Sequence, residues 1–194
     1  RHFEALAYGQ LPAFVGQLVT QEGMGAKALM FVILTAARSG EVRGAIWEEI
    51  DLAARVWTIP AERMKARKAH RVPLSDAAIA LLQEMKAHAQ AAGRTAGKAF
   101  VFPSPNSRDP ELGSPLSDMT LTAVLRRLKL EAVPHGFRST FRDWCAEQTD
   151  YPNEVAEMAL AHAVGNKVEA AYRRGDLFGK RQQLMQDWAD YALG

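Results

Sequence analysis

The sequence predicts a mainly α-helical protein with one small antiparallel β-sheet, an α+β fold. Through most of its 194 residues, apolar side chains recur three and four positions apart, which is the spacing of one helix face. Alternation of apolar and polar residues is confined to about 49–74, where it indicates about three short strands. A segment rich in Gly, Pro and Ser, 93–117, predicts a long surface loop. Because no complete core precedes that loop, we expect residues 1–194 to form a single domain.

The amino-terminal helices follow from the positions of the apolar residues. The first is expected over about 10–22. The second, over about 26–37, is apolar almost all round and should be buried at the centre of the core. Arg38 follows it directly, and a new short helix begins at Glu41. Arg38 would therefore hold its charge at a well-braced edge of the core.

The later elements follow from alternation, capping signals and helical spacing. Strands are expected at 49–52, 55–59 and 70–74, the last two joined by the basic hairpin MKARKA at 64–69. Ser75 and Asp76 should cap a helix that runs from 77 to about 92. Further helices are expected at about 118–130, 136–148, 153–161, 166–173 and 179–192.

The composition is that of a globular protein in water, with 48% hydrophobic and 24% charged residues. No apolar run is long enough to cross a membrane, and no signal-peptide pattern opens the chain. The single cysteine, Cys145, excludes an internal disulfide and is expected to be a small core residue. These features favour a cytoplasmic protein.

The net charge of +2 conceals three basic clusters, at 63–71, 126–142 and 167–181. Together they hold fifteen of the 24 Lys and Arg residues. Such clusters are usually solvated faces with no further role. If they share one surface, they form a binding site for a polyanion such as nucleic acid. The sequence leaves both interpretations open.

The segment VPHGFRSTFR contains the pair on which the functional prediction is centred. His135 and Arg138 are three residues apart, so both can face the same point from one helical turn. Phe137 and Phe141 lie on a different side, where they can anchor that turn in the core. Arg binds phosphate oxygens with a planar fork, and His exchanges a proton near neutral pH. By itself, such a pair is more often an ordinary surface or core pair.

Four motifs that could converge on one site follow one another along the chain: TAARSGEVRGAIWEEIDL, MKARKAHRVPLS, VPHGFRSTFRDW and LAHAVGNKVEAAYRRGD. In this order, and with Tyr172 ten residues after His162, the chain resembles the tyrosine recombinase (phage integrase) family. It is most similar to the branch of prophage and genomic-island integrases. One departure is Ala161, where many members have glycine. The family normally has an amino-terminal DNA-clamping domain, and often an arm-binding domain before it; we expect neither here, and so the catalytic domain alone.

The resemblance implies site-specific DNA recombination, the integration or excision of a mobile element, through a 3′-phosphotyrosyl intermediate. Tyr172 would be the nucleophile, and a base is needed because a free phenol has a pKa near 10. Arg38 and Arg138 would clamp the non-bridging phosphate oxygens as negative charge grows on them. The reaction needs neither a metal nor another cofactor, because the covalent bond to tyrosine keeps the energy of the broken phosphodiester.

The remaining roles are those that the resemblance implies. His135 would accept the proton of the phenol, Lys65 would protonate the leaving deoxyribose oxygen, and His162 would donate a hydrogen bond to the phosphate. Glu41 would orient Arg38. As a carboxylate in the first turn of a helix, Glu41 also has an ordinary explanation in the helix dipole.

The expected partners are double-stranded DNA attachment sites and other protomers, assembled as a tetramer on DNA at the nucleoid, with no membrane involved. Basic residues that flank the motifs would contact the DNA: Arg63, Arg67, Lys68, Arg71, Arg126, Arg127, Arg142, Arg173 and Arg174. His70 and His88 lack a partner pattern and are expected at the surface. The apolar stripe of the last helix should pack on its own domain, although docking on a neighbouring protomer stays open.

Two other functions remain alternatives. A type IB topoisomerase shares this chemistry but relaxes DNA without partner strands. A non-catalytic DNA-binding or assembly module would keep the fold but lack residues of the site, and all of them are present here.

Overall fold

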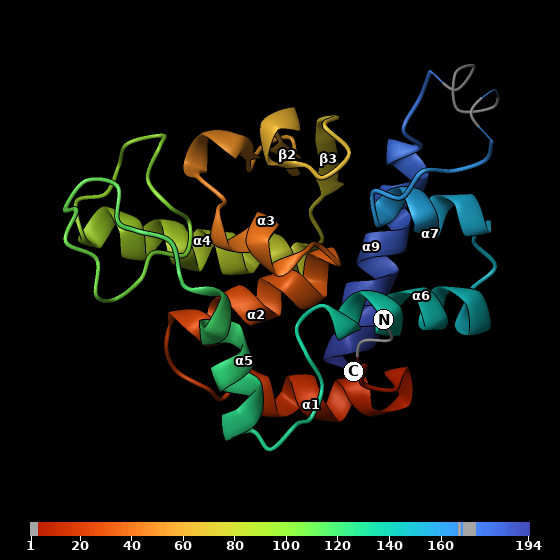
Figure 1. Cartoon of the computed structure of the whole chain (residues 1–194), viewed down its shortest axis with the longest axis horizontal. Helices are drawn as coiled ribbons and strands as arrows, with labels where there is room; N and C mark the ends of the chain where they lie inside the picture. The colour runs from red at the N-terminus through yellow and green to blue at the C-terminus, as the bar shows by residue number, and fades with distance from the viewer. Residues whose placement is uncertain (1–3, 167, 169–173) are drawn as a thin grey trace.

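A computed structural model describes residues 4–166, 168 and 174–194 of the chain. It confirms the predicted fold class, helices packed around a central helix with one small antiparallel sheet to one side (Figure 1). Among the described residues, the helices are α1 (Leu11–Leu18), α2 (Met24–Thr35), α3 (Ser39–Arg43), α4 (Asp76–Ala91), α5 (Asp118–Arg127), α6 (Gly136–Gln148), α7 (Asn153–Ala159) and α9 (Phe178–Leu193). Most of the helix expected at 166–173 lies outside the described residues.

Helix α2 forms the centre of the core, as its apolar sequence predicts. Its residues from Ala28 to Thr35 are all buried, and it contacts the surrounding helices α1, α4, α5, α6 and α9. The carbonyl of Ile33 accepts a hydrogen bond of 2.7 Å from the Trp188 indole, which ties α9 to this centre. The apolar stripe of α9 therefore packs within its own chain, apart from Leu193, which is exposed.

Three strands form the sheet of the described part of the chain: β1 (Ile50–Asp51), β2 (Val56–Ile59) and β3 (His70–Pro73). They are antiparallel in the order β1-β2-β3, with Trp57 opposite Val72. Trp57 is fully buried and its ring centroid lies 5.3 Å from that of Phe31 on α2. The sheet is thus fixed on the core, and the connection between β2 and β3 extends beyond it.

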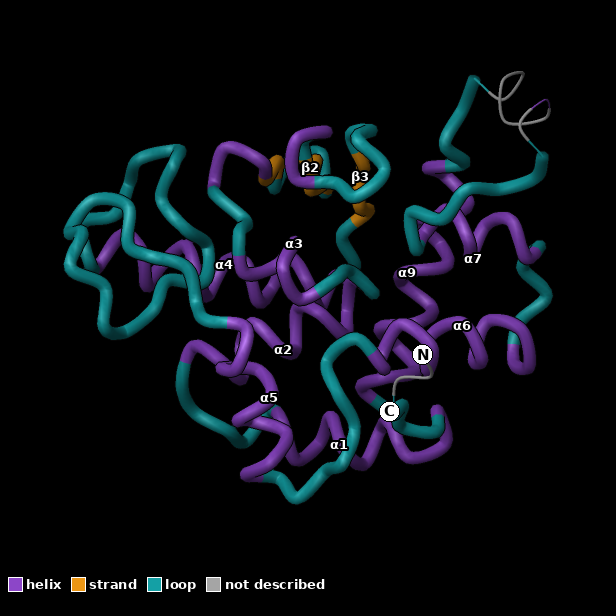
Figure 2. The backbone as a smooth tube through the Cα atoms, in the orientation of Figure 1, coloured by secondary structure: helices purple, strands orange, loops and turns teal. Residues whose placement is uncertain are grey.

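The loop between α4 and α5 is as long as predicted (Figure 2). Its apolar residues do not stay at the surface, because Val101 and Phe102 are buried. Isolated bridges join Ile46 to Phe100 and Pro103 to Pro115. The loop is therefore a packed part of the domain.

Helix α1 ends at Leu18, before the predicted 22, and α5 and α7 also end earlier than predicted because left-handed caps close their last turns. Helix α5 ends at Arg127, where Lys129 adopts a left-handed backbone conformation (φ 56°) and the Leu130 N–H bonds to the Leu125 carbonyl. Helix α7 ends at Ala159 and is closed in the same way, by Ala161 in a left-handed conformation (φ 55°) and a hydrogen bond from the His162 N–H to the Glu157 carbonyl. This second cap sets the position of His162.

The amino-terminal segment crosses the start of α6. The Glu4 carbonyl accepts a hydrogen bond of 3.2 Å from the Val133 N–H, and the Thr140 hydroxyl donates one of 2.5 Å to the Leu6 carbonyl. A Cβ at Gly136 would lie 2.2 Å from the Glu4 carbonyl oxygen, so this position in HGFR requires glycine. In the described part of the chain, no helix is both long and apolar enough for a membrane span.

Candidate active site

Arg138 lies in the first turn of α6 and is only 5% exposed. Phe137 and Phe141 are buried, as predicted. Their rings pack at 5.6 Å from the Phe14 ring and 5.2 Å from the Trp188 ring, measured between centroids. The aromatic contacts fix the helix, and the helix in turn fixes the guanidinium.

The Arg138 guanidinium joins the ends of two other helices. Its Nη1 donates a hydrogen bond of 2.6 Å to the carbonyl of Ala36, the residue that caps α2 in a left-handed conformation. Its Nη2 donates one of 2.7 Å to the carbonyl of Leu160, at the end of α7. Burial lowers the pKa of Arg138 to about 10, so the group keeps its charge at neutral pH. A permanent cation is therefore held rigidly at the edge of the core.

Arg38 precedes α3 and is held by Glu41. The Arg38 N–H and Nη1 each donate a hydrogen bond of 3.0 Å to the Glu41 carboxylate, one to each oxygen. Glu41 is only 6% exposed, whereas the Arg38 side chain is 25% exposed. Glu41 thus contacts both the start of the helix and the side chain of the arginine, so the two explanations of Glu41 are compatible.

His162 is fixed on both sides of its ring. Its Nδ1 lies 2.8 Å from the Glu157 carboxylate, whose other oxygen pairs with Arg142 Nε at 2.8 Å. Its Nε2 lies 3.3 Å from Arg138 Nη2. Sequence reasoning did not single out Glu157, although it stands one and a half helical turns before His162 in VAEMALAH.

His135 is half-buried at the start of α6. Burial is the main reason that its pKa is lowered. The charges of other basic side chains lower this pKa further, namely Arg138, Arg38, His162 and Lys65. The imidazole is therefore neutral at neutral pH and able to accept a proton.

Lys65 is exposed on the connection between β2 and β3. Met64 before it is buried, and the Arg67 N–H bonds to the Met64 carbonyl at 3.0 Å. This hydrogen bond closes a turn with Lys65 at its tip.

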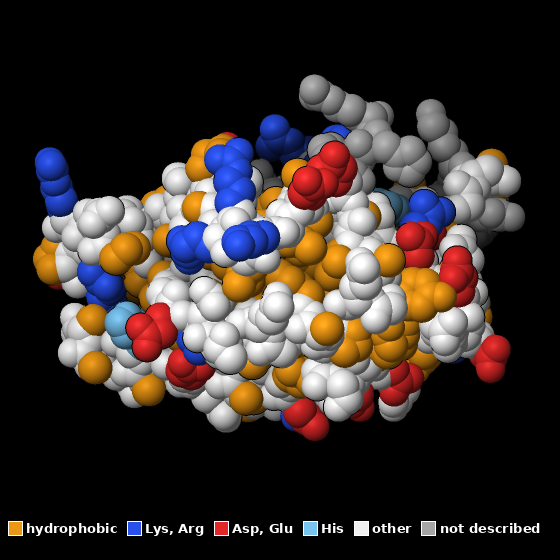
Figure 3. Space-filling view, turned by 90° about the horizontal axis from the view of Figure 1, so that it is seen from below, with side chains coloured by type: hydrophobic (Ala, Val, Ile, Leu, Met, Phe, Trp, Pro, Cys, Tyr) orange, Lys and Arg blue, Asp and Glu red, His pale blue; other side chains and the backbone are white. Residues whose placement is uncertain are grey.

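The candidate nucleophile Tyr172 and its neighbour Arg173 lie outside the described residues. Among the other flanking basic residues, three side chains form ion pairs within the domain: Arg63 with Glu49, Arg71 with Asp176 and Arg142 with Glu157. The exposed remainder consists of Arg67, Lys68, Arg126, Arg127 and Arg174. Figure 3 shows one face on which Lys and Arg side chains gather beside exposed hydrophobic ones.

His70 corrects a prediction. We expected it at the surface, but it is half-buried where β3 meets the end of α7. Burial, more than any other effect, lowers its pKa to about 4, and the charges of Arg181, Arg138 and Arg38 act in the same direction. The sequence signal was its place at the start of a strand, directly after the basic hairpin. His88 is exposed, as predicted.

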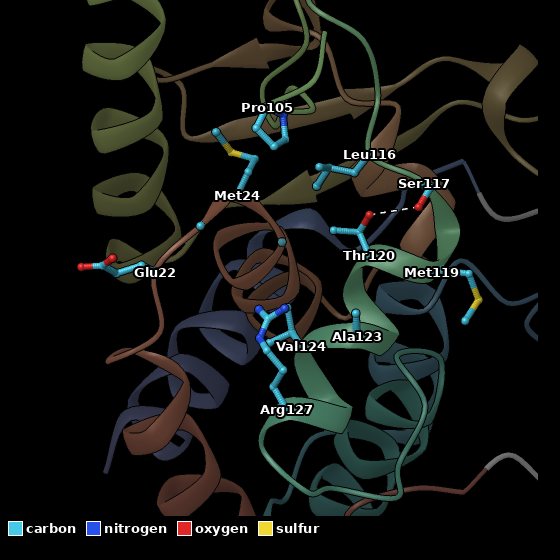
Figure 4. A pocket seen from close by; sticks show the side chains of 12 residues that line it. Glu22, Met24, Pro105, Leu116, Ser117, Met119, Thr120, Ala123, Val124 and Arg127 are labelled. Atoms are coloured by element: carbon cyan, nitrogen blue, oxygen red, sulfur yellow. Dashed lines mark hydrogen bonds between the residues drawn. The ribbon is translucent and has the colours of Figure 1, made fainter.

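Two hollows at the surface differ in whether predicted catalytic residues line them. One of about 670 Å³ lies between the β2–β3 connection and residues 158–164 and 174–176, and is lined by Lys68, His70 and His162, among others. The other, of about 440 Å³, lies between the start of α2 and α5 and contains none of the six predicted catalytic residues (Figure 4). Within the described residues, no group of three or more His, Cys, Asp or Glu could hold a metal ion.

Comparison with known proteins gives a consistent set of relatives. Residues 10–176 match the model of the phage integrase family. Prophage integrase IntA of Escherichia coli (strain K12) is 38% identical over 188 residues, which cover 93% of this chain and 42% of that protein. The chain spans about half the length of the curated relatives it matches, or less.

Solved structures show the same fold at low sequence identity. An integrase from mycobacterium phage Brujita superposes with a TM-score of 0.66 at 15% identity, covering 96% of this chain and 58% of that one. The Tn1549 transposon integrase, solved in complex with circular intermediate DNA, gives a TM-score of 0.59 at 17% identity over 90% of this chain and 66% of that one.

Proposed function

This chain belongs to the phage integrase family, and on that basis we propose that it is the catalytic domain of a tyrosine site-specific recombinase. It cleaves and rejoins DNA strands, so that a mobile element is integrated into a chromosome or excised from it. The reaction takes place in the cytoplasm, at the nucleoid.

The observation that carries this proposal is the gathering of basic side chains around His135. Arg138, Arg38, His162 and Lys65 come from four separate parts of the chain, yet the charge of each lowers the pKa of this one imidazole. A bound anion would be attracted to this concentration of basic groups. A DNA phosphodiester is an anion of the required kind, and its charge spreads over the non-bridging oxygens during attack.

Arg138 and Arg38 bind those oxygens. Both guanidinium groups are oriented before DNA arrives, Arg138 by two main-chain carbonyls and Arg38 by Glu41. Donors that need no reorganisation stabilise a transition state well, and losing one typically costs about 3–4 kcal/mol, roughly a hundred- to a thousandfold in rate. His162, held through Nδ1 by Glu157, contributes a hydrogen bond to the phosphate once its Nε2 carries a proton.

Tyr172 performs the covalent step. Its phenolic oxygen bonds to phosphorus while the bond from phosphorus to the 5′ oxygen breaks. The phenolic proton passes to His135, and Lys65 gives a proton to the departing 5′ oxygen. The 5′ hydroxyl of another strand later attacks the phosphotyrosine and reverses these steps, so that no ATP is consumed.

The substrate is a double-stranded attachment site, on which protomers assemble as a tetramer. The Tn1549 integrase supports a DNA partner, because it was solved in complex with DNA. The residues proposed to contact DNA phosphates are Arg67, Lys68, Arg126, Arg127, Arg173 and Arg174. Arg63, Arg71 and Arg142 are left out because their guanidinium groups are paired within the domain.

A nicked DNA substrate tests the proposal, because cleavage next to the nick releases a short fragment and traps the covalent adduct. The wild-type protein should form a protein–DNA adduct visible on a denaturing gel, and Tyr172→Phe should abolish it. Tyr151→Phe is the matched control, since that hydroxyl bonds to Asp187 within the domain. An adduct that survives Tyr172→Phe contradicts the proposal, and relaxation of supercoiled DNA without site preference would favour a topoisomerase.

A further inference from the structure

We propose that Arg63 is a positioning residue for the general acid. It holds the root of the Lys65 turn against the start of α3, with Glu49 as its buried counter-charge. The inference rests on the proposed function, because it assumes that Lys65 protonates the 5′ oxygen. It assigns to Arg63 a role different from the DNA contact that its place in a basic cluster had predicted.

The pair of Arg63 and Glu49 has the geometry of a fixed clamp. Arg63 Nε and Nη2 donate to the two carboxylate oxygens of Glu49 at 2.9 Å and 2.6 Å. The Trp57 indole donates a further hydrogen bond of 3.1 Å to the same carboxylate. Glu49 is only 9% exposed. The planar guanidinium of Arg63 makes two hydrogen bonds to a buried carboxylate, so the Arg63 side chain has little conformational freedom.

The same guanidinium reaches the residue that orients Arg38. Arg63 Nη2 donates a hydrogen bond of 3.1 Å to the main-chain carbonyl of Glu41, whose side chain holds Arg38. The phosphate-binding arginine and the hairpin root are therefore fixed to one residue. Any displacement of Arg63 moves the turn relative to the arginine clamp.

The close approach of Arg63 to α3 depends on Gly44. A Cβ at this position would lie 2.4 Å from Arg63 Nη1. The glycine just after α3 thus leaves room for the guanidinium to pass. The chain has the space, the counter-charge and the hydrogen-bond acceptor that this one side chain needs.

The link from Arg63 to Lys65 is short. Only Met64 separates them, and Met64 is buried, so the chain is anchored twice immediately before the lysine. The hydrogen bond from the Arg67 N–H to the Met64 carbonyl then returns the chain and leaves Lys65 exposed at the tip. Because the root is anchored and the tip is free, the position of the ammonium group follows the position of Arg63.

Sulfur substitution in the DNA separates a positioning role from a structural one. When the bridging 5′ oxygen is replaced by sulfur, the leaving group is a thiolate, whose conjugate acid has a pKa of about 8.5 instead of roughly 15 for an alcohol. A thiolate departs without receiving a proton. A defect in general acid catalysis therefore disappears with the sulfur substrate, whereas a defect in folding, DNA binding or phosphate clamping persists.

The test compares Arg63→Lys with the wild type on nicked DNA carrying either bridging atom. Lysine keeps the charge beside Glu49 but cannot form the fork or reach the Glu41 carbonyl at the same time. Arg63→Lys should slow cleavage of the oxygen substrate at least about tenfold, within the roughly 10²–10⁴ available from general acid catalysis. The sulfur substrate should be cleaved within about twofold of the wild-type rate.

Two controls make the outcomes distinct. Lys65→Ala should show the same pattern more strongly, and a Lys65→Ala variant that sulfur does not rescue would contradict the assigned role of Lys65 in the proposed function. Arg43→Lys makes the same chemical change on α3, at a side chain that bonds to Ser39 and Leu116, and should slow neither substrate. Suppose that sulfur restores cleavage by Lys65→Ala. The inference about Arg63 is then overturned if Arg63→Lys slows the cleavage of both substrates equally, or slows the cleavage of neither.

Discussion

Arg138 shows what one buried residue contributes to this site. Its charge is kept in a setting that lowers its pKa to about 10, because two main-chain carbonyls and the nearby carboxylates offset part of the desolvation. Both carbonyls belong to residues at helix ends, where no intrahelical partner is available. The arginine thus satisfies acceptors at the ends of α2 and α7, and it is oriented by the same contacts.

Ala161 allows a test at this scale. It adopts a left-handed conformation (φ 55°) that costs an alanine roughly 1–2 kcal/mol and a glycine much less. A glycine also has a higher conformational entropy in the unfolded chain, which reduces the gain in stability from the substitution by about 0.5–1 kcal/mol. We expect Ala161→Gly to raise the free energy of unfolding by up to about 1.5 kcal/mol, measured by urea denaturation.

The control for Ala161→Gly lies two residues earlier. Ala159 is buried in the last turn of α7, so Ala159→Gly should lower the free energy of unfolding by at least about 1 kcal/mol. If both glycine variants destabilise the protein equally, the left-handed cap does not carry the strain assigned to it. The conformation also explains why a glycine suits this position without any role in the chemistry.

At the scale of elements, the site depends on contacts between segments distant in sequence. Strand β3 is held to the start of α9 by the pair of Arg71 and Asp176, with two contacts of 2.8 Å. Arg181, fully buried on α9, also donates to the Arg71 carbonyl. His70, at the start of β3, contacts the backbone of Ala159 at the end of α7. The hairpin is therefore attached to α9 and to the end of α7, which His162 follows.

His70 makes this contact sensitive to pH. Its pKa in the folded protein is about 4, against an ordinary value of 6.5, so the unfolded chain binds more protons between these values. Stability that is complete above pH 6.5 is therefore lost as the pH falls toward 4. At pH 5 this loss amounts to about 2 kcal/mol.

Comparison with His70→Gln isolates that contribution from the titration of other groups. The difference in free energy of unfolding between the wild type and His70→Gln should shrink by about 2 kcal/mol from pH 7.5 to pH 5, because Gln does not titrate. A difference that stays constant for His70→Gln between these pH values would contradict the lowered pKa of His70 in the folded protein.

At the scale of the whole molecule, binding to DNA is governed by the basic side chains that the fold leaves free. Of the basic residues predicted to contact DNA, Arg67, Lys68, Arg126, Arg127 and Arg174 are exposed, whereas Arg63, Arg71 and Arg142 are paired with carboxylates of the domain. The structure thus divides the basic clusters of the sequence into side chains that hold the domain together and side chains available to a polyanion.

The salt dependence of DNA binding should reflect that division. If about five phosphates are neutralised, the logarithm of the binding constant falls with the logarithm of salt concentration with a slope near −4.5. Lys68→Ala should reduce the slope by about one, as measured by fluorescence anisotropy with duplex DNA. An affinity that does not change with salt would contradict a phosphate-contacting surface.

Much of the fold and part of the site could be predicted from the sequence, because they depend on local patterns. Apolar spacing predicted α2 as the central helix, and alternation predicted the three strands. The spacing of His135 and Arg138 predicted a helix that directs both side chains to one point. The two phenylalanines on another side of this helix were predicted to be buried in the core. The predicted ends of α5 and α7 lie beyond the observed ends. Both helices are closed by residues in a left-handed conformation, Lys129 and Ala161, and neither is the glycine that would indicate such a cap in the sequence.

The sequence by itself determined the family, the order of the motifs and the residue types that phosphate chemistry needs. Only the tertiary structure decided which basic residues are free. Arg63 and Lys68 belong to the same cluster, but one is clamped by a buried carboxylate from another segment and the other is exposed. The tertiary structure likewise buried His70 among arginines and placed Glu157 against His162. The physical reason is that burial and charge pairing depend on neighbours brought together by folding, which local spacing does not encode.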